Sequence, residues 1–173
     1  MAMRRKAKQM MRTLALAVLA FVTAPVAYAQ TLEGAQALMG AGRYAEAAQM
    51  LEATIVAEPE NAAAWNMLGA AHNYGENYAR ANEAAERAVS LDPATTSYRF
   101  NRALTRWEVG QFEGALDDHD AVLARNPNAA NVLTERGATL AALDRYEEAE
   151  ASWAASLVAD PNYVWAHYYR GQA

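Results

Sequence analysis

The 173-residue chain contains no cysteine, which excludes disulfides, thiolate metal sites and thiol catalysis. Lysine is nearly absent too. The sequence has two lysines, Lys6 and Lys8, and both lie close to the N-terminus. The sequence also lacks a phosphate-binding glycine loop, a zinc-binding His-Glu-x-x-His motif and a Gly-x-Ser-x-Gly nucleophile turn. We therefore expect a protein with no catalytic residues, no metal and no cofactor.

Residues 1–29 have the three parts of a secretory signal peptide. Five basic residues come first, an apolar run from Leu14 to Val22 follows, and Ala-Tyr-Ala at residues 27–29 provides a cleavage site. The apolar run is shorter than the roughly 20 residues that span a bilayer, which favours a cleaved signal over a retained membrane anchor. We expect cleavage after Ala29, export to the periplasm or outside of a bacterial cell, and no integral membrane segment in the mature chain.

Without this leader the chain is strongly acidic. Removing its five cations from the 15 basic residues leaves 10 arginines against 20 acidic residues, a net charge near −10. Nucleic acids and anionic membranes are bound by clustered cations. The composition therefore indicates a partner other than nucleic acid.

Several residue types recur with a period of 34 residues after residue 30. The prolines in this register are Pro59, Pro93, Pro127 and Pro161. An aromatic residue followed three positions later by alanine recurs at Tyr44/Ala47, Tyr78/Ala81, Phe112/Ala115 and Tyr146/Ala149. A fixed period of this length is typical of a repeat architecture.

Each unit reads as a pair of helices. Two stretches of about 14 residues carry apolar or small side chains at helical spacing, with Trp65, Leu68 and His72 on one face and Ala81 and Ala88 on the next. Short turn segments separate the two stretches. Proline, which has no amide hydrogen to donate, is expected to end the second helix, and the small residues should let the two helices pack closely.

This pattern resembles the tetratricopeptide repeat, whose 34-residue signature is W-x2-L-G-x2-Y, then A-x3-F, A and P. Residues 62–95 match best, with His72 and Ala85 replacing the signature tyrosine and phenylalanine. The matching residues are Trp65, Leu68, Gly69, Ala81, Ala88 and Pro93. The resemblance implies an all-α, right-handed α-solenoid over residues 30–173. Its repeats would cover about 28–61, 62–95, 96–129 and 130–163, with a partial repeat or capping helix over 164–173.

The same resemblance implies a concave groove, lined by the first helix of each hairpin, that binds a peptide or another protein. The groove positions of this chain hold Leu32, Gln36, Asn66, Asn73, Tyr74, Phe100, Trp107, Asn131, Thr134, Trp165 and Tyr168. Asparagine can bond a peptide backbone, and aromatic rings supply contact area at low entropic cost. Phe100 and Trp107 have an alternative role, because they can instead pack between neighbouring repeats.

Some members of the family clamp a C-terminal carboxylate with lysines and asparagines in this groove. The corresponding positions here hold Leu32, Gln36, Met67, Ser97 and Asn101, of which Asn101 alone has a suitable side chain. We therefore do not expect this chain to bind chaperone tails in that way.

Arginine is periodic as well, at Arg102, Arg136 and Arg170, in the slot that Leu68 fills in the second repeat. An arginine on a buried face needs a partner, and Asp117 or Asp118 can supply one. The spacing favours a ladder of ion pairs between helices. An anionic ligand on the face shared by arginines 99, 102 and 106 is the alternative. The acidic run 117–120 is not a metal site, because consecutive helical residues point in different directions.

The last helix expected from the sequence, over residues 164–173, carries Val164, Trp165, Tyr168 and Tyr169. One side of it can cover the fourth repeat, and the other side would present aromatic rings. Two functions follow. The first is an adaptor of the bacterial periplasm or envelope that binds a protein in its groove. The alternative is a structural subunit of an envelope assembly that associates with itself through Trp165, Tyr168 and Tyr169.

Overall fold

The computed structural model describes residues 30–171, so the predicted signal peptide lies outside the described part of the chain. Within residues 30–171 all regular secondary structure is helical, beginning with a helix over residues 30–40. The helices that follow are α2 (Tyr44–Ala57), α3 (Ala62–Tyr74), α4 (Tyr78–Leu91), α5 (Thr96–Glu108), α6 (Phe112–Leu123), α7 (Ala130–Ala142), α8 (Tyr146–Ala159) and α9 (Val164–Arg170).

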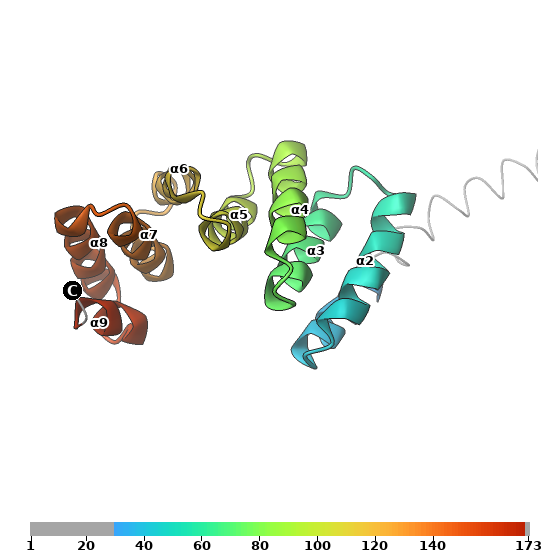
Figure 1. The fold of residues 1–173 in the computed structure, drawn as a ribbon, viewed down its shortest axis with the longest axis horizontal. Coiled ribbons are helices and arrows are strands. Elements are labelled where there is room, and N and C mark those ends of the chain that lie inside the picture. The colour runs from blue at the N-terminus through green and yellow to red at the C-terminus, as the bar shows by residue number, and fades with distance from the viewer. Residues whose placement is uncertain (1–29, 172–173) are drawn as a thin grey trace, which may run out of the picture.

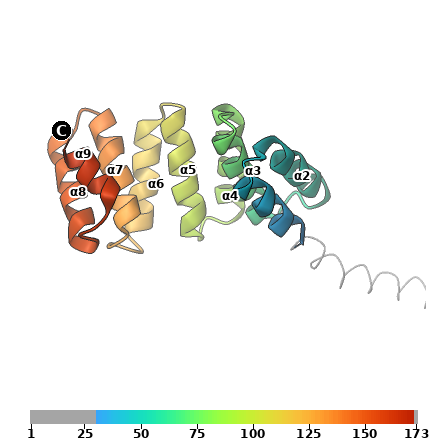
Figure 2. The ribbon, with the colours of Figure 1, turned by 90° about the horizontal axis from the view of Figure 1, so that it is seen from below.

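Consecutive helices pack as hairpins, and the hairpins stack in a row from α2 to α9 (Figure 1). The first helices α3, α5 and α7 begin 34 residues apart, at Ala62, Thr96 and Ala130. Seen from below, α2 to α8 stand side by side, and α9 lies in front of α7 and α8 (Figure 2). This arrangement is the α-solenoid predicted by the repeat pattern. Among residues 30–171, no helix combines the length and apolar character needed to cross a membrane.

Small residues set the spacing of the second hairpin. A Cβ atom added at Gly69 on α3 would lie 3.2 Å from the carbonyl oxygen of Ala81 and 3.3 Å from the amide nitrogen of Ala85 on α4. Ala81, Ala85 and Ala88 are all buried. The predicted close approach of the two helices is confirmed, and a larger side chain at Gly69 would overpack it.

Every hairpin turn places one residue in the left-handed region of backbone space. These residues are again 34 apart, with φ between 58° and 76°: Gly42, Glu76, Gly110 and Asp144. Glycine adopts this conformation without strain, whereas a residue with a Cβ loses about 1 kcal/mol. The hairpin geometry therefore imposes the same turn on glycine and non-glycine residues alike.

Proline ends each unit and also orients the next one. Helices α2, α4 and α8 stop two residues before a proline, as predicted. In three units the proline carbonyl oxygen bonds the side chain six residues later, namely Trp65 Nε1 with Pro59 (2.9 Å), Arg99 Nε with Pro93 (3.2 Å) and His167 Nε2 with Pro161 (2.9 Å). Leu133, six residues after Pro127, has no side-chain donor. This contact explains why the position six residues after the proline holds a side-chain donor in three of the four units.

Candidate functional site

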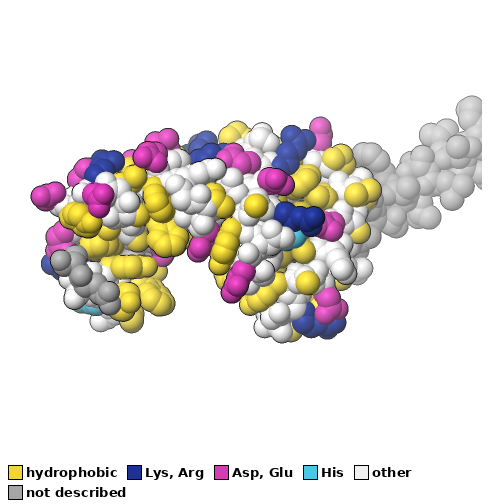
Figure 3. All heavy atoms as spheres, viewed as in Figure 1, with side chains coloured by type: hydrophobic (Ala, Val, Ile, Leu, Met, Phe, Trp, Pro, Cys, Tyr) yellow, Lys and Arg dark blue, Asp and Glu magenta, His cyan; other side chains and the backbone are white. Residues whose placement is uncertain are grey.

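The first helices of neighbouring hairpins form one layer, because α3 contacts α5 and α7 contacts α9. The molecule is hollowed at its lower edge, between the end made by α7 to α9 and the end made by α2 to α4, and hydrophobic side chains gather on the walls of this hollow (Figure 3). We call the surface over α3, α5, α7 and α9 the inner face. It corresponds to the groove expected from the sequence.

Five aromatic side chains in residues 30–171 are more than a third exposed: Tyr74, Trp107, Tyr146, Trp165 and Tyr168. All except Tyr146 come from the first helices α3, α5 and α9. Grouped exposed aromatic rings mark interaction surfaces, whereas single exposed apolar residues are ordinary. Four residues of the predicted groove are therefore accessible on the inner face.

A small polar pocket lies where α3 meets α5. The side-chain amide of Asn101 donates a hydrogen bond to Asn66 Oδ1 at 2.9 Å. The Oδ1 atom of Asn73 is buried and has no hydrogen-bond partner among residues 30–171. With Tyr74 and Leu104, these asparagines line a cavity of about 40 Å³. The structure thus brings Asn66, Asn73 and Tyr74 together.

Phe100 is half-buried, and its ring centroid lies 6.2 Å from that of His119, so it contributes to packing between α5 and α6. Trp107 is 40% exposed and meets Phe112 edge-on at 6.0 Å. Asn131 is exposed at the start of α7. Trp107 therefore offers more surface to a partner than Phe100 does.

Thr134 is a correction. It was predicted to face the groove, but it is fully buried. Its hydroxyl lies 2.8 Å from the hydroxyl of Ser156, which in turn donates to the carbonyl oxygen of Ala130 at 2.8 Å. Because Ser156 offers a polar partner inside the hairpin, the threonine hydroxyl is satisfied there, and Thr134 belongs to the core between α7 and α8.

An aromatic pocket of about 450 Å³ lies between α5, α7, α8 and α9. We call it the aromatic pocket, and its lining residues are Trp107, Ala138, Ala141, Ala142, Tyr146, Trp153 and Tyr169. The three alanines of α7 provide small side chains, and the four rings come from separate parts of the chain. Predominantly apolar, concave surfaces of this size are typical of binding sites.

Trp153 is held rigidly in this pocket. Its indole nitrogen donates to the carbonyl oxygen of Thr134 at 3.1 Å, and its ring stacks on Tyr169 with centroids 5.7 Å apart and planes 7° apart. A Cβ atom at Gly137 would lie 2.3 Å from Trp153 Nε1, so only glycine leaves room for the ring. The stack places one face of Tyr169 against Trp153, so Trp165 and Tyr168 are the more exposed residues of the predicted self-association surface.

The aromatic pocket itself was not predicted from the sequence. The sequence does contain a signal for it. Trp153 occupies the repeat position that holds Ala85 in α4 and His119 in α6. It lies opposite Gly137, which occupies the position of Ala103 in the preceding repeat. A tryptophan in a slot that elsewhere holds a smaller residue indicates local repacking, but its neighbours depend on how α9 crosses α7 and α8.

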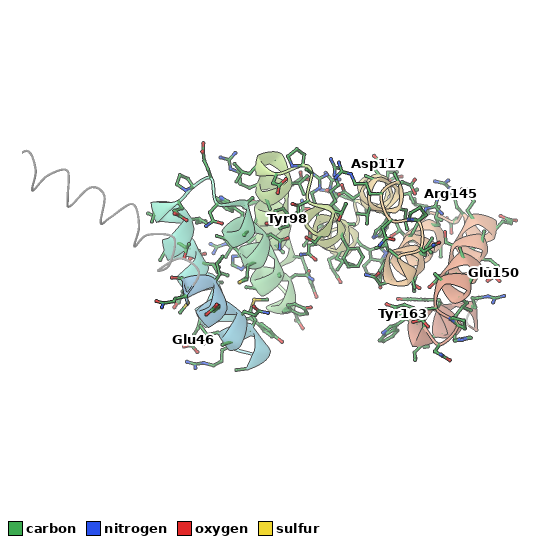
Figure 4. The ribbon with its side chains drawn as sticks, turned by 180° about the vertical axis from the view of Figure 1, so that it is seen from behind. Glu46, Tyr98, Asp117, Arg145, Glu150 and Tyr163 are labelled. Carbon is green, nitrogen blue, oxygen red and sulfur yellow. The ribbon has the colours of Figure 1, made fainter. Side chains whose placement is uncertain are left out.

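One acidic side chain near the aromatic pocket, Glu135, has no cationic partner among residues 30–171. Glu135 on α7 is mostly buried, and this burial raises its pKa. Burial and then the negative charge of Glu135 raise the pKa of Tyr163 and Tyr169. Glu147 lines an adjoining hollow together with Tyr146, and there Arg170 is bonded to Glu150 at 2.6 Å. In Figure 4, Tyr163 lies at the start of α9, on the side that faces the hollow at the lower edge of the molecule. Glu150 lies on the outer side of α8.

The periodic arginines form ion pairs between helices, as predicted. Arg102 bonds Asp118 on α6 at 2.6 and 2.7 Å and Glu86 on α4 at 2.9 Å. Arg136 bonds Asp120 and Ser152, both at 2.6 Å. These residues lie 34 positions after Glu86 and Asp118, so the two arginines bond residues at the same two repeat positions.

Asp118 is 1% exposed and accepts hydrogen bonds from three arginines, Arg99, Arg102 and Arg106. Asp117, the other predicted partner, points outward from the upper edge of α6 (Figure 4). The arginine face that might have held an anion is therefore occupied by carboxylates of the protein.

His119 is the most perturbed histidine of the described chain. It is 1% exposed, and neither ring nitrogen has a hydrogen-bond partner among residues 30–171. Burial lowers its pKa from 6.5 to about 4, against the opposing effect of Asp118 and Asp120. No group of acidic or histidine side chains within residues 30–171 has the geometry to hold a metal ion.

The sequence profile of the family described as "Tetratricopeptide repeat" matches residues 32–95, 74–130 and 100–164. Among characterised proteins, the small glutamine-rich tetratricopeptide repeat-containing protein 2 of Mycosarcoma maydis is 29% identical over 87 residues. This match covers 50% of the present chain and 25% of that protein.

Solved structures share the fold over most of the chain. A structure of MamA from Desulfovibrio magneticus RS-1 superposes with a TM-score of 0.76 at 19% identity, covering 83% of this chain and 81% of that one. MamA MSR-1 has a TM-score of 0.70 at 28% identity, over 81% and 78%. The first tetratricopeptide repeat domain of Spaghetti (RPAP3), bound to the HSP90 peptide SRMEEVD, has a TM-score of 0.61 at 23% identity, over 64% and 88%.

Proposed function

This chain belongs to the tetratricopeptide repeat family, and from that premise we propose that it is a non-catalytic adaptor whose inner face binds a segment of another protein. The observation that carries the proposal is the exposure of aromatic rings on three of the first helices, at Tyr74, Trp107, Trp165 and Tyr168. A concave surface of stacked hairpins is suited to holding an extended partner.

Two features of the inner face support contact with a polypeptide. The asparagines near Asn73 form a polar site of about 40 Å³ between α3 and α5, next to the exposed ring of Tyr74. Beyond it, the aromatic pocket offers apolar area for a side chain. A segment lying along α3, α5 and α7 would meet both, and a related domain, that of Spaghetti (RPAP3), was solved with a peptide bound.

The proposal extends to an exported protein of the bacterial periplasm or envelope. Its support is the order of basic, apolar and small-x-small segments in residues 1–29, and the absence of cysteine is compatible with an oxidising compartment. N-terminal sequencing of the protein recovered from cells should begin at Gln30. An intact N-terminus would contradict cleavage after Ala29.

Photo-crosslinking in living cells tests the adaptor function. The crosslinking residue is placed at Phe100 on the inner face or, as a matched control, at exposed Glu83 on α4. An adaptor gives an adduct with a different protein from Phe100 and not from Glu83. Equal capture at both positions, or none at Phe100, would contradict the proposal.

Self-association in an envelope assembly is the second candidate. Trp165 is 57% exposed and Tyr168 is 51% exposed, and their rings meet edge-on at 5.9 Å, forming one aromatic surface on α9. If this surface joins two copies, Trp165→Ala should shift the protein to monomer in sedimentation experiments, whereas Trp107→Ala should leave its mass unchanged. A protein that is monomeric at all concentrations would exclude this candidate.

A further inference from the structure

The aromatic pocket has properties that specify the chemistry of what enters it. Four rings, those of Trp107, Tyr146, Trp153 and Tyr169, surround a floor of alanines in a space of about 450 Å³. Trp153 and Tyr169 are fixed by their stack and by the indole hydrogen bond to Thr134. The site is therefore already formed before a partner arrives, which reduces the entropic cost of binding.

The electrostatic surroundings of the pocket are one-sided. Glu135 lies on α7 one helical turn before Ala138, which lines the pocket, and its charge acts on Tyr169, one of the four rings. No cationic side chain of residues 30–171 pairs with Glu135. The nearby arginines already have acidic partners: Arg136 bonds Asp120, Arg145 bonds Glu148 and Arg170 bonds Glu150. An incoming cation would thus meet free negative charge and no competing guanidinium.

Ring faces and unpaired carboxylates favour the same kind of ligand. The faces of tryptophan and tyrosine attract cations placed within about 6 Å of the ring centroid. Arginine and lysine also have long apolar stems, which can cover alanine side chains while the charged group reaches the rings and the carboxylate. A neutral apolar side chain would pack on the alanines and the rings, but it would gain no cation–π attraction and would leave Glu135 without a partner.

We infer that the aromatic pocket binds an arginine or lysine side chain of the protein partner, with Trp107 and Glu135 as the residues that select the positive charge. The inference rests on the proposed function. It specifies which side chain the bound segment of the partner places in the aromatic pocket, at the end of the molecule made by α7 to α9. The charge balance agrees, because residues 30–173 carry 20 acidic residues against 10 arginines.

The test compares three blocked tripeptides that differ in the central residue: Ac-Ala-Arg-Ala-NH₂, its neutral isostere with citrulline, and its apolar counterpart with norleucine. Binding to the protein is followed by the indole N–H resonances of Trp107 and Trp153 in ¹H–¹⁵N spectra. We expect the arginine peptide to shift these resonances with an affinity about tenfold higher than either neutral peptide.

Variants assign the effect to the pocket. Trp107→Leu and Glu135→Gln should each reduce the affinity for the arginine peptide several-fold and leave the weak binding of the citrulline peptide nearly unchanged. Val158→Ala, at an 85% exposed position on α8, and Glu83→Gln, on the exposed side of α4, serve as controls and should change neither. Circular dichroism confirms that each variant is folded.

Two results would overturn the inference. Norleucine binding as tight as arginine binding would show that the pocket takes an apolar side chain, and an absence of shifts at Trp107 and Trp153 would show that it takes neither. If the crosslinking residue at position 100 still captures a partner in either case, the adaptor function stands, and only the selection of a positively charged side chain by the aromatic pocket is contradicted. If Phe100 captures no partner, the proposed function fails independently of the peptide result.

Discussion

The third hairpin, α5 and α6, and the fourth, α7 and α8, use identical repeat positions with different chemistry. At two slots of the second helix, Asp118 and His119 in the third hairpin correspond to Ser152 and Trp153 in the fourth. Asp118 gathers three arginines, whereas Ser152 receives one hydrogen bond, from Arg136. Ion pairs at Asp118 therefore hold the helices of the third hairpin together, whereas the packed indole ring of Trp153 holds those of the fourth.

This difference shows that the repeat determines where side chains meet between helices but does not determine which type of interaction they make there. A slot must be filled and its polar groups must be bonded, but either an ion network or an aromatic stack meets these requirements. The consequence reaches the inner face. The large ring of Trp153, with Tyr169 stacked on it, forms part of a pocket beside the fourth hairpin, whereas His119 at the same slot contacts Phe100 inside the third.

The largest expected effect is at the charged centre of the third hairpin. Asp118→Ala should lower the free energy of unfolding by about 3 to 5 kcal/mol, because it leaves partly buried arginines without their shared carboxylate. Ser152→Ala, at the same slot of the fourth hairpin, should lower it by about 1 kcal/mol. Urea unfolding of both variants measures the difference.

The exposed neighbour Asp117 is the matched control, and Asp117→Ala should change stability by no more than about 0.5 kcal/mol. If Asp118→Ala were as mild as this control, the third hairpin would not depend on its ion network.

The aromatic packing of the fourth hairpin is tested by Gly137→Ala. The added Cβ would lie 2.3 Å from Trp153 Nε1, so we expect a loss of about 2 to 3 kcal/mol. In a Trp153→Leu background the same substitution should be at least about 1 kcal/mol less damaging, because the two sites are coupled through their contact. Gly40→Ala, where nothing lies within 4 Å, should cause no loss. Additive effects of Gly137→Ala and Trp153→Leu would contradict this packing.

The buried histidine makes the third hairpin sensitive to pH. The folded pKa of His119, about 4, lies below the reference value of 6.5, so the unfolded state binds the proton first as the pH falls. Its contribution to stability is complete above pH 6.5 and is lost between pH 6.5 and 4. From pH 7 to pH 5 this loss amounts to about 2 kcal/mol.

His119→Leu isolates this contribution. The variant should lose about 2 kcal/mol less stability than the wild type between pH 7 and pH 5, since His72 and the carboxylates titrate in both proteins. Identical pH dependence of urea unfolding in the two proteins would show that His119 does not titrate in this range.

The smallest effect concerns a feature that both hairpins share. Gly110 in the third turn and Asp144 in the fourth have φ of 76° and 58°. Gly110→Ala should lower stability by about 1 kcal/mol, because alanine is strained in this conformation. Asp144→Gly should change stability by less than that, since relief of strain is offset by loss of the hydrogen bond from the Tyr146 hydroxyl. A neutral Gly110→Ala would show that the turn can relax.

The helix pairs, their close packing at Gly69 and the pairing of Arg102 with an aspartate of the following helix follow from the period in the sequence. Within one unit, the helical spacing between Arg102 and Asp118 is enough to predict their contact. Glu86 was not foreseen as a second partner, because it belongs to the preceding hairpin and its approach depends on how the hairpins stack.

The candidate site was predictable only in part, for the same reason. Tyr74, Trp107, Trp165 and Tyr168 lie exposed as expected from their positions on first helices. Thr134 was misplaced because its hydroxyl finds a buried partner in Ser156, which helical spacing does not reveal. The aromatic pocket depends on α9 bringing Tyr169 onto Trp153, a contact between units that the repeat pattern leaves undetermined.

The most direct test of the account removes one ring from the inner face. With the crosslinking residue at Phe100, Trp107→Ala should reduce the adduct with the partner protein about tenfold or more. The variant also loses its edge contact with Phe112, so circular dichroism confirms that it is folded under the conditions of the crosslinking experiment. Val158→Ala, at an 85% exposed position on α8, should leave capture unchanged. Undiminished capture by folded Trp107→Ala would contradict the claim that the inner face is where this protein binds its partner.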